Sequence, residues 1–375
     1  MLTKVIVAID SFKGCLASDE VEAVVAETIR WKYPACEVCC LPVADGGEGM
    51  LPVLVRATGG RFITADVHDP LMRPLRARYG VLGDGKTAVI EMAEASGLPL
   101  LAAQERNPMQ ATSFGTGELI RHALRSGYRK LLVGIGGSAT NDGGMGMLQA
   151  LGFRFYDQTG KELGQGGMMM EQVARVDSRQ VEKALAEADV TVACDVQNPF
   201  CGAEGAAFVF APQKGATPEQ VVCLDEGLRH WAEVIFRTTG KDVRLLPGAG
   251  AAGGMGGALH AFLHASLQPG IELLLDAVRF NEELTDADLV ITGEGRADSQ
   301  TLMGKVPAGV LHRALARGVR AVLLAGQIHD GQTLLHAGFS RLLPVTPEGM
   351  PLCEAVRPET ARENIRRAVE DFLGF

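Results

Sequence analysis

The chain begins with a short apolar run that leads into an acidic, glycine-containing loop: Val5-Ile6-Val7-Ala8-Ile9, then Asp10-Ser11-Phe12-Lys13-Gly14. An apolar, β-branched run without polar alternation is typical of a strand that is buried on both faces of a sheet. Ser18 then offers a helix N-cap, and apolar residues recur at helical spacing at Val21, Val24, Val25 and Ile29. The stretch therefore predicts a strand, a loop at its carboxyl end and a returning helix.

The same alternation continues in both ends of the chain. Residues 37–43 read as a second strand and 51–57 as a helix, after the loop 45–49. Near the other end, strands are expected at 289–292, 321–324 and 341–345, with helices at 310–316 and 358–375. Strands that alternate with helices favour a parallel sheet. We expect an α/β protein in which residues 1–60 and 285–375 together form a Rossmann-like parallel-sheet domain.

The middle of the chain has a different pattern. Strand-like runs follow one another at 61–67, 76–82 and 87–92, and Asp84-Gly85 is a hairpin signal between the last two. A helix at 115–125 and buried strands at 131–135 and 190–194 come later. This mixture predicts that residues 61–284 form a mixed α/β domain inserted into the first one.

Composition excludes several classes of protein. The net charge of −9 argues against nucleic acid as a partner, because phosphate backbones need a basic surface. No run approaches the roughly 20 apolar residues that span a bilayer, and an acid follows the first apolar run too early for a signal peptide. The eight cysteines are spread thinly, unlike a disulfide scaffold, and Cys36, Cys39 and Cys40 lack a second ligand pair for a metal. We expect a cytoplasmic protein; a homo-oligomer is left open.

Five loops that combine glycine or polar residues with a carboxylate follow predicted strands. They are Asp10 to Gly14; Asp45-Gly46-Gly47-Glu48-Gly49; Gly136-Gly137-Ser138-Ala139-Thr140-Asn141-Asp142-Gly143-Gly144; Asp195 with Asn198; and Gly293-Glu294-Gly295-Arg296-Ala297-Asp298-Ser299, with Lys305 beyond it.

Ligands of parallel α/β sheets bind at the carboxyl ends of the strands, where these loops fall. Phosphoryl transfer needs backbone N–H groups and cations for the phosphates, and carboxylates for Mg²⁺ and the attacking hydroxyl. For any single loop the competing interpretation is an ordinary turn or helix cap, since Gly, Asp and Ser are common there. Five loops of the same chemistry at strand ends favour a phosphate-handling site.

Two motif matches compete with other interpretations. The segment 80–87 fits G-x-x-x-x-G-K-T, but a phosphate-binding loop must join a strand to a helix, and a hairpin is favoured here unless residues 88–95 are helical. The segment 248–253 fits a dinucleotide-binding fingerprint, yet Pro247 interrupts any strand before it. A flexible lid or tight helix packing is the favoured interpretation of these glycines.

At these loops the sequence resembles the type-1 glycerate kinase family, almost from end to end. The resemblance rests on the five loops and on three further strings: Glu91-Met92-Ala93-Glu94-Ala95-Ser96-Gly97-Leu98, Gly115-Thr116-Gly117-Glu118-Leu119-Ile120 and Gly248-Ala249-Gly250-Ala251-Ala252-Gly253-Gly254. It implies ATP-dependent, Mg²⁺-assisted phosphorylation of D-glycerate, usually to 2-phosphoglycerate. It also implies two α/β domains with the active site in the cleft between them, and a role in assimilating carbon from glyoxylate, glucarate or galactarate.

Within that framework each candidate residue receives a role as a hypothesis. Asp195 would orient or deprotonate the glycerate hydroxyl. Asp45 and Glu48 would hold Mg²⁺. Lys13 and Arg296 would hold anionic groups, as catalytic residues beside Asp195. The remaining candidates for substrate or phosphate binding are Asp10, Ser11, Gly136, Gly137, Ser138, Asn141, Asp142, Asn198, Glu294, Asp298 and Lys305.

Two rival functions stay open at this point. One is a small-molecule kinase that acts on a different hydroxy acid or sugar acid. The other is a nicotinamide-dependent oxidoreductase that uses the glycine-rich segment 248–253. A non-catalytic binding protein is disfavoured by the number of ionisable residues in the loops.

Overall fold

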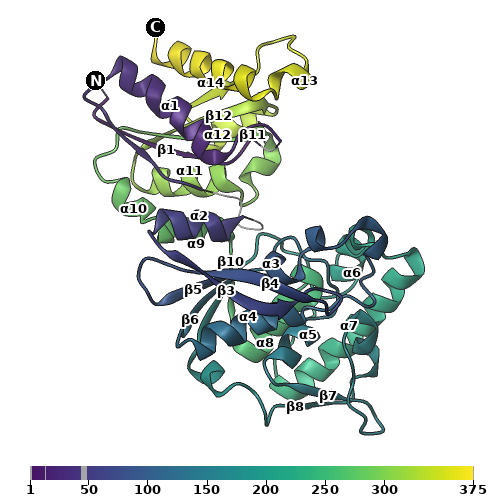
Figure 1. Ribbon diagram of the computed structural model, residues 1–375. Helices are drawn as coiled ribbons and strands as arrows, with labels where there is room; N and C mark the ends of the chain where they lie inside the picture. The colour runs from purple at the N-terminus through teal and green to yellow at the C-terminus, as the bar shows by residue number, and fades with distance from the viewer. Residues whose placement is uncertain (1, 13, 44–48, 375) are drawn as a thin grey trace. The chain divides into compact units, whose positions relative to one another are not determined.

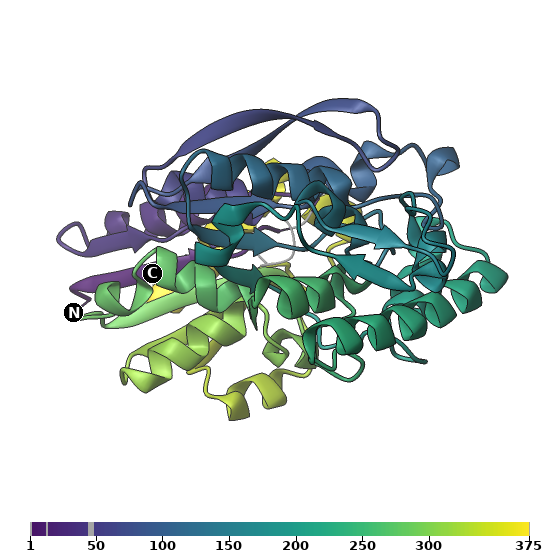
Figure 2. The same cartoon turned by 90° about the horizontal axis from the view of Figure 1, so that it is seen from below.

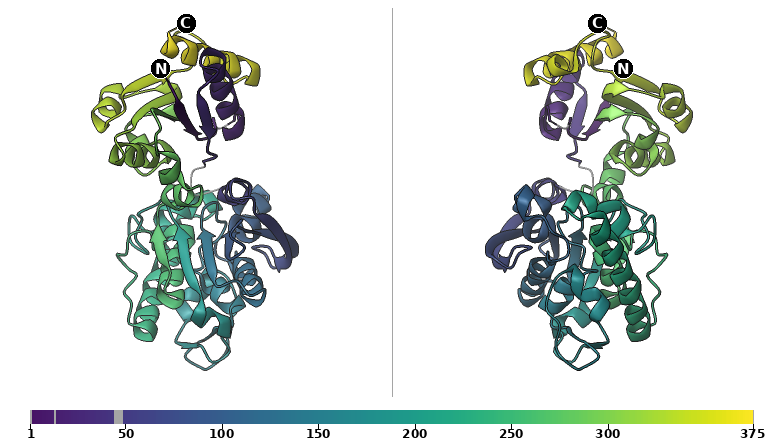
Figure 3. Two further views of the ribbon diagram at one scale, coloured as in Figure 1. Left: turned by 90° about the vertical axis from the view of Figure 1, so that its left-hand side faces the viewer. Right: turned by 90° about the vertical axis from the view of Figure 1, so that its right-hand side faces the viewer.

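The computed structural model describes residues 2–12, 14–43 and 49–374. The chain forms two compact units: unit 1 comprises Met1–Asp45 and Ile271–Phe375, and unit 2 comprises Gly46–Gly270. Figure 3 shows the purple N-terminal and the yellow C-terminal segments together in unit 1. The sequence analysis expected the divisions after residues 60 and 284.

Unit 1 is built on a five-stranded sheet in which all neighbouring strands are parallel. Its order is β13-β12-β11-β1-β2, and strands from both chain ends pair directly, with Val5 opposite Leu289 and Ile9 opposite Gly293. The predicted parallel sheet is therefore confirmed. The strands are β1 (Lys4–Ile9), β2 (Glu37–Cys40), β11 (Leu289–Ala297), β12 (Arg320–Ile328) and β13 (Arg341–Pro344).

Helices cover both faces of this sheet. α1 (Ser18–Lys32) and α14 (Pro358–Leu373) pack against each other on one face, and α11 (Val306–Ala316) packs on the other (Figure 1). Val5, Val7 and Ile9 contribute to the core under α1 and α14, whereas Ile6 and Ala8 are buried on the opposite face. Burial on both faces explains why the run lacks polar alternation. The remaining helices are α9 (Gly270–Ala277), α10 (Phe280–Glu283), α12 (Gly331–Ala337) and α13 (Leu352–Ala355).

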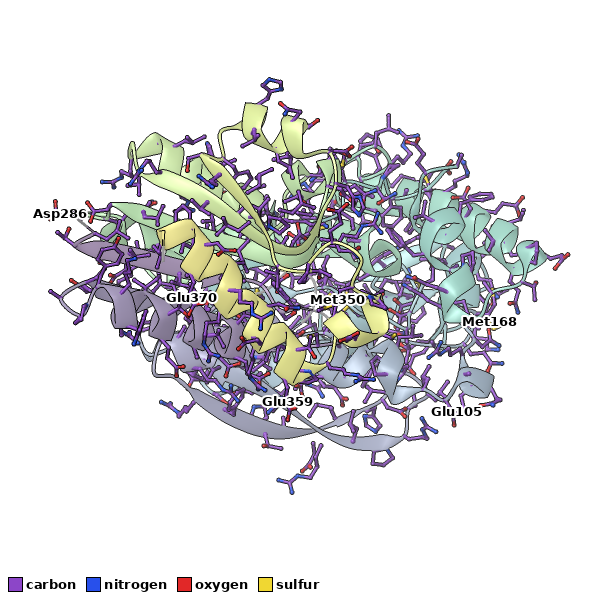
Figure 4. All side chains as sticks on the ribbon, turned by 90° about the horizontal axis from the view of Figure 1, so that it is seen from above. Glu105, Met168, Asp286, Met350, Glu359 and Glu370 are labelled. Atoms are coloured by element: carbon purple, nitrogen blue, oxygen red, sulfur yellow. The ribbon has the colours of Figure 1, made fainter. Side chains whose placement is uncertain are left out.

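The ends of α1 and α14 show how the helices are fixed. The expected N-cap is wrong by one residue: Ala17 occupies that position, and the Ser18 hydroxyl instead donates to the Ile9 carbonyl at 2.5 Å, which ties α1 to the end of β1. Figure 4 labels Glu359 and Glu370 along α14 and Met350 in the segment before α13. The Met350 sulfur accepts a hydrogen bond from the buried Asn364 amide at 3.4 Å, so this segment is held against α14.

Unit 2 contains a six-stranded mixed sheet of order β10-β9-β6-β5-β4-β3. The first four strands are parallel to one another, and β5-β4-β3 are joined as antiparallel neighbours. β3 and β4 appear as two long blue strands in Figure 2. The strands are β3 (Arg61–His68), β4 (Pro74–Val81), β5 (Thr87–Glu91), β6 (Lys130–Gly134), β9 (Asp189–Ala193) and β10 (Ser266–Gln268), and β7 (Arg154–Tyr156) pairs with β8 (Arg175–Asp177) in a separate two-stranded antiparallel sheet.

The helices of unit 2 enclose one large apolar core. Trp231 on the long helix α7 is fully buried, stacks on Phe262 and meets Phe155 edge to face. The helices are α2 (Met50–Ala57), α3 (Ala93–Ser96), α4 (Phe114–Arg125), α5 (Met145–Ala150), α6 (Ala206–Phe210), α7 (Pro218–Thr239) and α8 (Met255–Leu263).

α2 packs in unit 2, although the sequence pattern placed it with the first parallel sheet. The Glu91 carboxylate at the end of β5 accepts hydrogen bonds from the N–H groups of Gly49 and Leu51, so it caps the start of the helix. Gly80 on β4 leaves room for the side chains of Leu51 and Val55. Periodicity alone cannot detect a cap supplied 40 residues later.

The segment 80–87 forms the predicted hairpin. β4 and β5 pair antiparallel on either side of it, and the Asp84 carboxylate accepts hydrogen bonds from the N–H groups of Lys86 and Thr87. Because a strand follows the turn, the alternative of a phosphate-binding loop with a helical 88–95 is wrong.

Among the described helices, none has the length and apolar character needed to cross a membrane.

The crossing of α4 and α5 gives a test of this packing. A Cβ on Gly117 would lie 2.3 Å from the Met147 carbonyl oxygen and 2.7 Å from the Ala150 Cβ. Helix propensity alone predicts that Gly117→Ala stabilises the protein by about 1 kcal/mol. We expect it instead to lower the free energy of unfolding, measured by denaturant titration, by about 1–3 kcal/mol.

A matched control is Gly227→Ala in α7. There the nearest atoms to an added Cβ belong to the flexible Met170 side chain, at 3.3 and 3.5 Å. This variant should be neutral or slightly stabilised. A stabilised Gly117→Ala protein would contradict the described contact between α4 and α5.

Candidate functional site

Unit 1 has a cavity of about 690 Å³ at the carboxyl ends of its parallel strands, which we call the unit-1 cavity. This is the edge where open α/β sheets bind ligands. The structure brings six of the predicted residues together in its lining: Asp10, Ser11, Glu294, Arg296, Asp298 and Lys305. Lys13, Asp45 and Glu48 lie outside the described residues.

Two cations of the unit-1 cavity are held differently. The buried Glu294 carboxylate accepts from Lys305 Nζ at 3.1 Å and from the Thr301 hydroxyl at 2.6 Å, so Lys305 has a fixed position. The Arg296 side chain is 66 % exposed, and it lies 3.7 Å from Asp298. A guanidinium so weakly paired can turn towards an anionic ligand.

The carboxylates Asp10 and Asp298 also shape their own loops. Asp298 caps the short 3₁₀ helix Ser299–Leu302 by accepting from the Gln300 N–H at 2.9 Å. Asp10 accepts from the Ser11 N–H at 2.7 Å, while its own N–H donates to the Gly293 carbonyl. These contacts agree with the helix-cap and turn alternative raised by the sequence, without removing either carboxylate from the cavity lining.

Part of the lining of the unit-1 cavity is apolar. This part comes from the loop after β1, the end of β13 and the segment that follows it: Phe12, Val345, Leu352 and Val356. A cavity lined by both cations and apolar side chains suits a ligand with a charged and an apolar part.

Unit 2 has a separate cavity of about 380 Å³, the unit-2 cavity, at the carboxyl ends of β6 and β9. The predicted residues Gly136, Gly137, Ser138 and Asp195 line it. One oxygen of the Asp195 carboxylate accepts the Gly270 N–H at 2.8 Å, at the first residue of α9. Asp195 is thus both fixed in position and part of the cavity wall.

The loop after β6 presents a row of backbone donors. The Leu98 N–H donates to the Gly137 carbonyl and the Ala139 N–H to the Ser96 carbonyl, which pins the loop to the segment 96–98. The N–H groups of residues 136–138 have no acceptor in the described part of the chain. Gly137 has a φ of +68°, which a residue with a side chain rarely adopts. Consecutive N–H groups of this kind form a binding site for an anion.

Lys214 is the residue that the sequence analysis missed. It lines the unit-2 cavity, is 2 % exposed, and donates from Nζ to Ser138 Oγ and to the Thr140 carbonyl, both at 2.7 Å. Burial lowers the pKa of Lys214 to about 7, and the nearby Asp142 carboxyl opposes that fall. The sequence feature that could have revealed Lys214 is its position as the one charged residue of the segment 205–216. The segment does not come directly after a strand, so a search of strand ends does not find it.

Three predicted residues do not line either cavity. Asp142 is fully buried and accepts from the N–H groups of Ser113, Gly144 and Gly146, so it holds the glycine-rich loop against α4 and α5. Burial raises the pKa of its carboxyl, and these hydrogen bonds oppose the rise. Asn141 is also fully buried. The Asn198 amide donates to the Glu204 carbonyl.

The segment 248–253 is packed too tightly to hold a dinucleotide. An added Cβ on Gly250 would lie 2.2 Å from the Pro199 carbonyl oxygen, and one on Gly253 would lie 2.2 Å from that of Thr140. The described element directly before this segment is the helix α7, not a strand. The helix-packing interpretation is confirmed, and the oxidoreductase hypothesis loses the motif on which it depended.

A magnesium ion would need oxygen donors from this chain. Within the described residues, no group of three or more His, Cys, Asp or Glu side chains could hold a metal ion. Mg²⁺ in phosphoryl transfer needs only one or two carboxylates besides phosphate oxygens. Asp10 and Asp298, both in the unit-1 cavity, supply donors of the required kind.

Comparison with known proteins assigns the chain to a family. The model of the glycerate kinase family matches residues 5–374. A glycerate kinase from Bacillus subtilis is 46% identical over 98% of this chain and 96% of its own length, and a glycerate 2-kinase from Escherichia coli K12 is 45% identical over 97% and 96%.

The solved structures give the same result. A protein from Salmonella typhimurium LT2, assigned as glycerate kinase 2, is 44% identical, covers 99% of this chain and 97% of its own, and superposes with a TM-score of 0.88. The predicted α/β class is confirmed, and the chain belongs to the glycerate kinase family: it is a kinase, a phosphotransferase that acts on an alcohol group.

Proposed function

We propose that this kinase transfers the γ-phosphoryl group of ATP to the 2-hydroxyl of D-glycerate and forms 2-phosphoglycerate. The unit-2 cavity is the observation that supports the substrate, because it combines an anion site with a carboxylate that can accept a proton. The names of the related glycerate kinases support glycerate as the substrate, and that of the Escherichia coli glycerate 2-kinase supports the 2-position.

D-Glycerate would bind in the unit-2 cavity. Its carboxylate would accept hydrogen bonds from the N–H groups of Gly136, Gly137 and Ser138. Its hydroxyl would lie against Asp195, which would accept the hydroxyl proton as the oxygen attacks phosphorus. Asn141, Asp142 and Asn198 would act indirectly, by holding the loops.

ATP would bind in the unit-1 cavity, which is the larger of the two. The base would lie against the apolar wall of Phe12, Val345 and Val356. Arg296 and Lys305 would contact the phosphates, with Ser11 and the sequence-predicted Lys13 beside them. Removal of a cation that clamps the transferred phosphoryl group costs on the order of 10²-fold or more in kcat.

Mg²⁺ would be held by oxygen donors near the phosphates. Asp45 and Glu48 are proposed from the sequence, and Asp10 and Asp298 are described carboxylates that fit the same role. When bound, the ion would neutralise charge on the phosphate oxygens.

We place the reaction in the cytoplasm, since all eight cysteines are free thiols. We place its role in the assimilation of glycerate from glyoxylate, glucarate or galactarate.

The reaction itself can be read from its product. Incubation of the pure protein with Mg²⁺, ATP and D-glycerate should give 2-phosphoglycerate and ADP, identified by phosphorus NMR. Formation of 3-phosphoglycerate would overturn the assigned position. Turnover of another hydroxy acid or sugar acid, with none of D-glycerate, would overturn the substrate.

Asp195→Asn tests the proposed base. The asparagine oxygen can still accept the Gly270 N–H, so the fold should be kept while the proton acceptor is lost. We expect kcat to fall by about 10²–10⁴-fold, with an unchanged KM for ATP, in steady-state assays.

The control for this variant is Asp66→Asn. Asp66 is a 92 % exposed carboxylate on β3, and its substitution should leave kcat within about twofold. A folded Asp195→Asn enzyme with a near-normal kcat would reject Asp195 as the base.

A further inference from the structure

The surroundings of Lys214 are unusual for a buried lysine. Both acceptors of its Nζ are neutral, namely Ser138 Oγ and the Thr140 carbonyl oxygen. No carboxylate within the described residues lies within ion-pair distance of it. A buried ammonium is costly without such a partner, so the empty site favours the neutral amine.

The charged groups around Lys214 do not supply that partner. Asp142, on the loop after β6, is the one whose charge acts on Lys214, but its carboxylate already accepts hydrogen bonds from Ser113, Gly144 and Gly146. Asp195, on the loop after β9, lines the same cavity. The backbone of Arg106 packs against Gly215, next to Lys214, and brings no carboxylate.

The cavity wall supplies the complementary half of an anion site. Lys214 donates to Ser138, whose own N–H is one of the three backbone donors at residues 136–138. The backbone donors and the amine therefore belong to residues that line one cavity. A carboxylate placed there is the opposite charge that Lys214 lacks, and it favours the charged amine.

We propose that Lys214 is a further substrate-binding residue, and that it takes up a proton from solvent when the carboxylate of the substrate enters the unit-2 cavity. The balance is one neutral amine, one proton and one carboxylate, which give an ammonium–carboxylate pair. This inference rests on the proposed binding of D-glycerate to that cavity.

The pH dependence of proton uptake follows from the pKa of Lys214, which is about 7 without ligand. Above pH 7 the empty site is mostly neutral and binding must gain a proton, whereas at pH 6 the amine is already charged. Proton uptake should be about 0.9 per site at pH 8 and about 0.1 at pH 6. The dissociation constant of D-glycerate should rise towards tenfold per pH unit above pH 8.

The experiment is calorimetric titration of the full chain with D-glycerate alone, at pH 6, 7 and 8, in buffers with different ionisation enthalpies. D-Glycerate itself takes up no proton in this range, because its carboxyl group ionises near pH 3.5. We expect a buffer-dependent heat at pH 8 that disappears at pH 6. Binding with no buffer dependence at pH 8 overturns the inference.

Variants identify the group that gains the proton. Lys214→Met should bind D-glycerate more weakly and abolish the buffer dependence of any remaining binding. Lys241→Met is the matched control, because Lys241 is another unit-2 lysine whose pKa burial lowers, but it lies outside this cavity. If Lys214→Met does not fold, a buffer-independent heat of binding to the wild-type protein at pH 8 still overturns the inference.

Failure of the proposed function has a different signature. A protein that phosphorylates no glycerate and gives no heat with it at any pH rejects the proposed substrate, and with it the inference. A protein that binds and phosphorylates glycerate, with a heat that is independent of the buffer, keeps the function and rejects only the role of Lys214.

Discussion

The buried contact between Lys214 and Ser138 is the interaction on which the proposed anion site of unit 2 depends. It joins an otherwise uncharged segment to the loop after β6, and both residues line the same cavity. A lysine kept at such a site without a carboxylate reduces stability unless an anion arrives. Under the proposed function, stability and ligand binding would therefore be coupled at this residue.

The fold is predictable where local pattern and tertiary burial agree. Val5 to Ile9 read as a strand because both faces of β1 are covered, by α1 on one side and α11 on the other. The strands β7, β8 and β10 escaped prediction because each has only three residues, too few for a periodicity. α2 was assigned to the wrong sheet because Glu91, far along the chain, fixes its N-terminus.

The candidate site was predictable in part for a geometric reason. Parallel strands of one sheet end at one edge, so loops that follow them gather there, and Asp10, Glu294 and Lys305 do meet in unit 1. Position after a strand does not decide whether a side chain faces the cavity or the core. Asp142 turns inward to bind N–H groups, whereas Lys214 reaches the cavity from a segment that follows no strand.

The central claim is that a small acid binds to the backbone donors of residues 136–138. Amide ¹⁵N–¹H spectra of the labelled protein, recorded as D-glycerate is added, address these donors individually. Hydrogen bonds to a carboxylate should move the amide protons of Gly136, Gly137 and Ser138 downfield. Shifts confined to the lining of the unit-1 cavity, such as Ser11 and Gly295, would contradict the account.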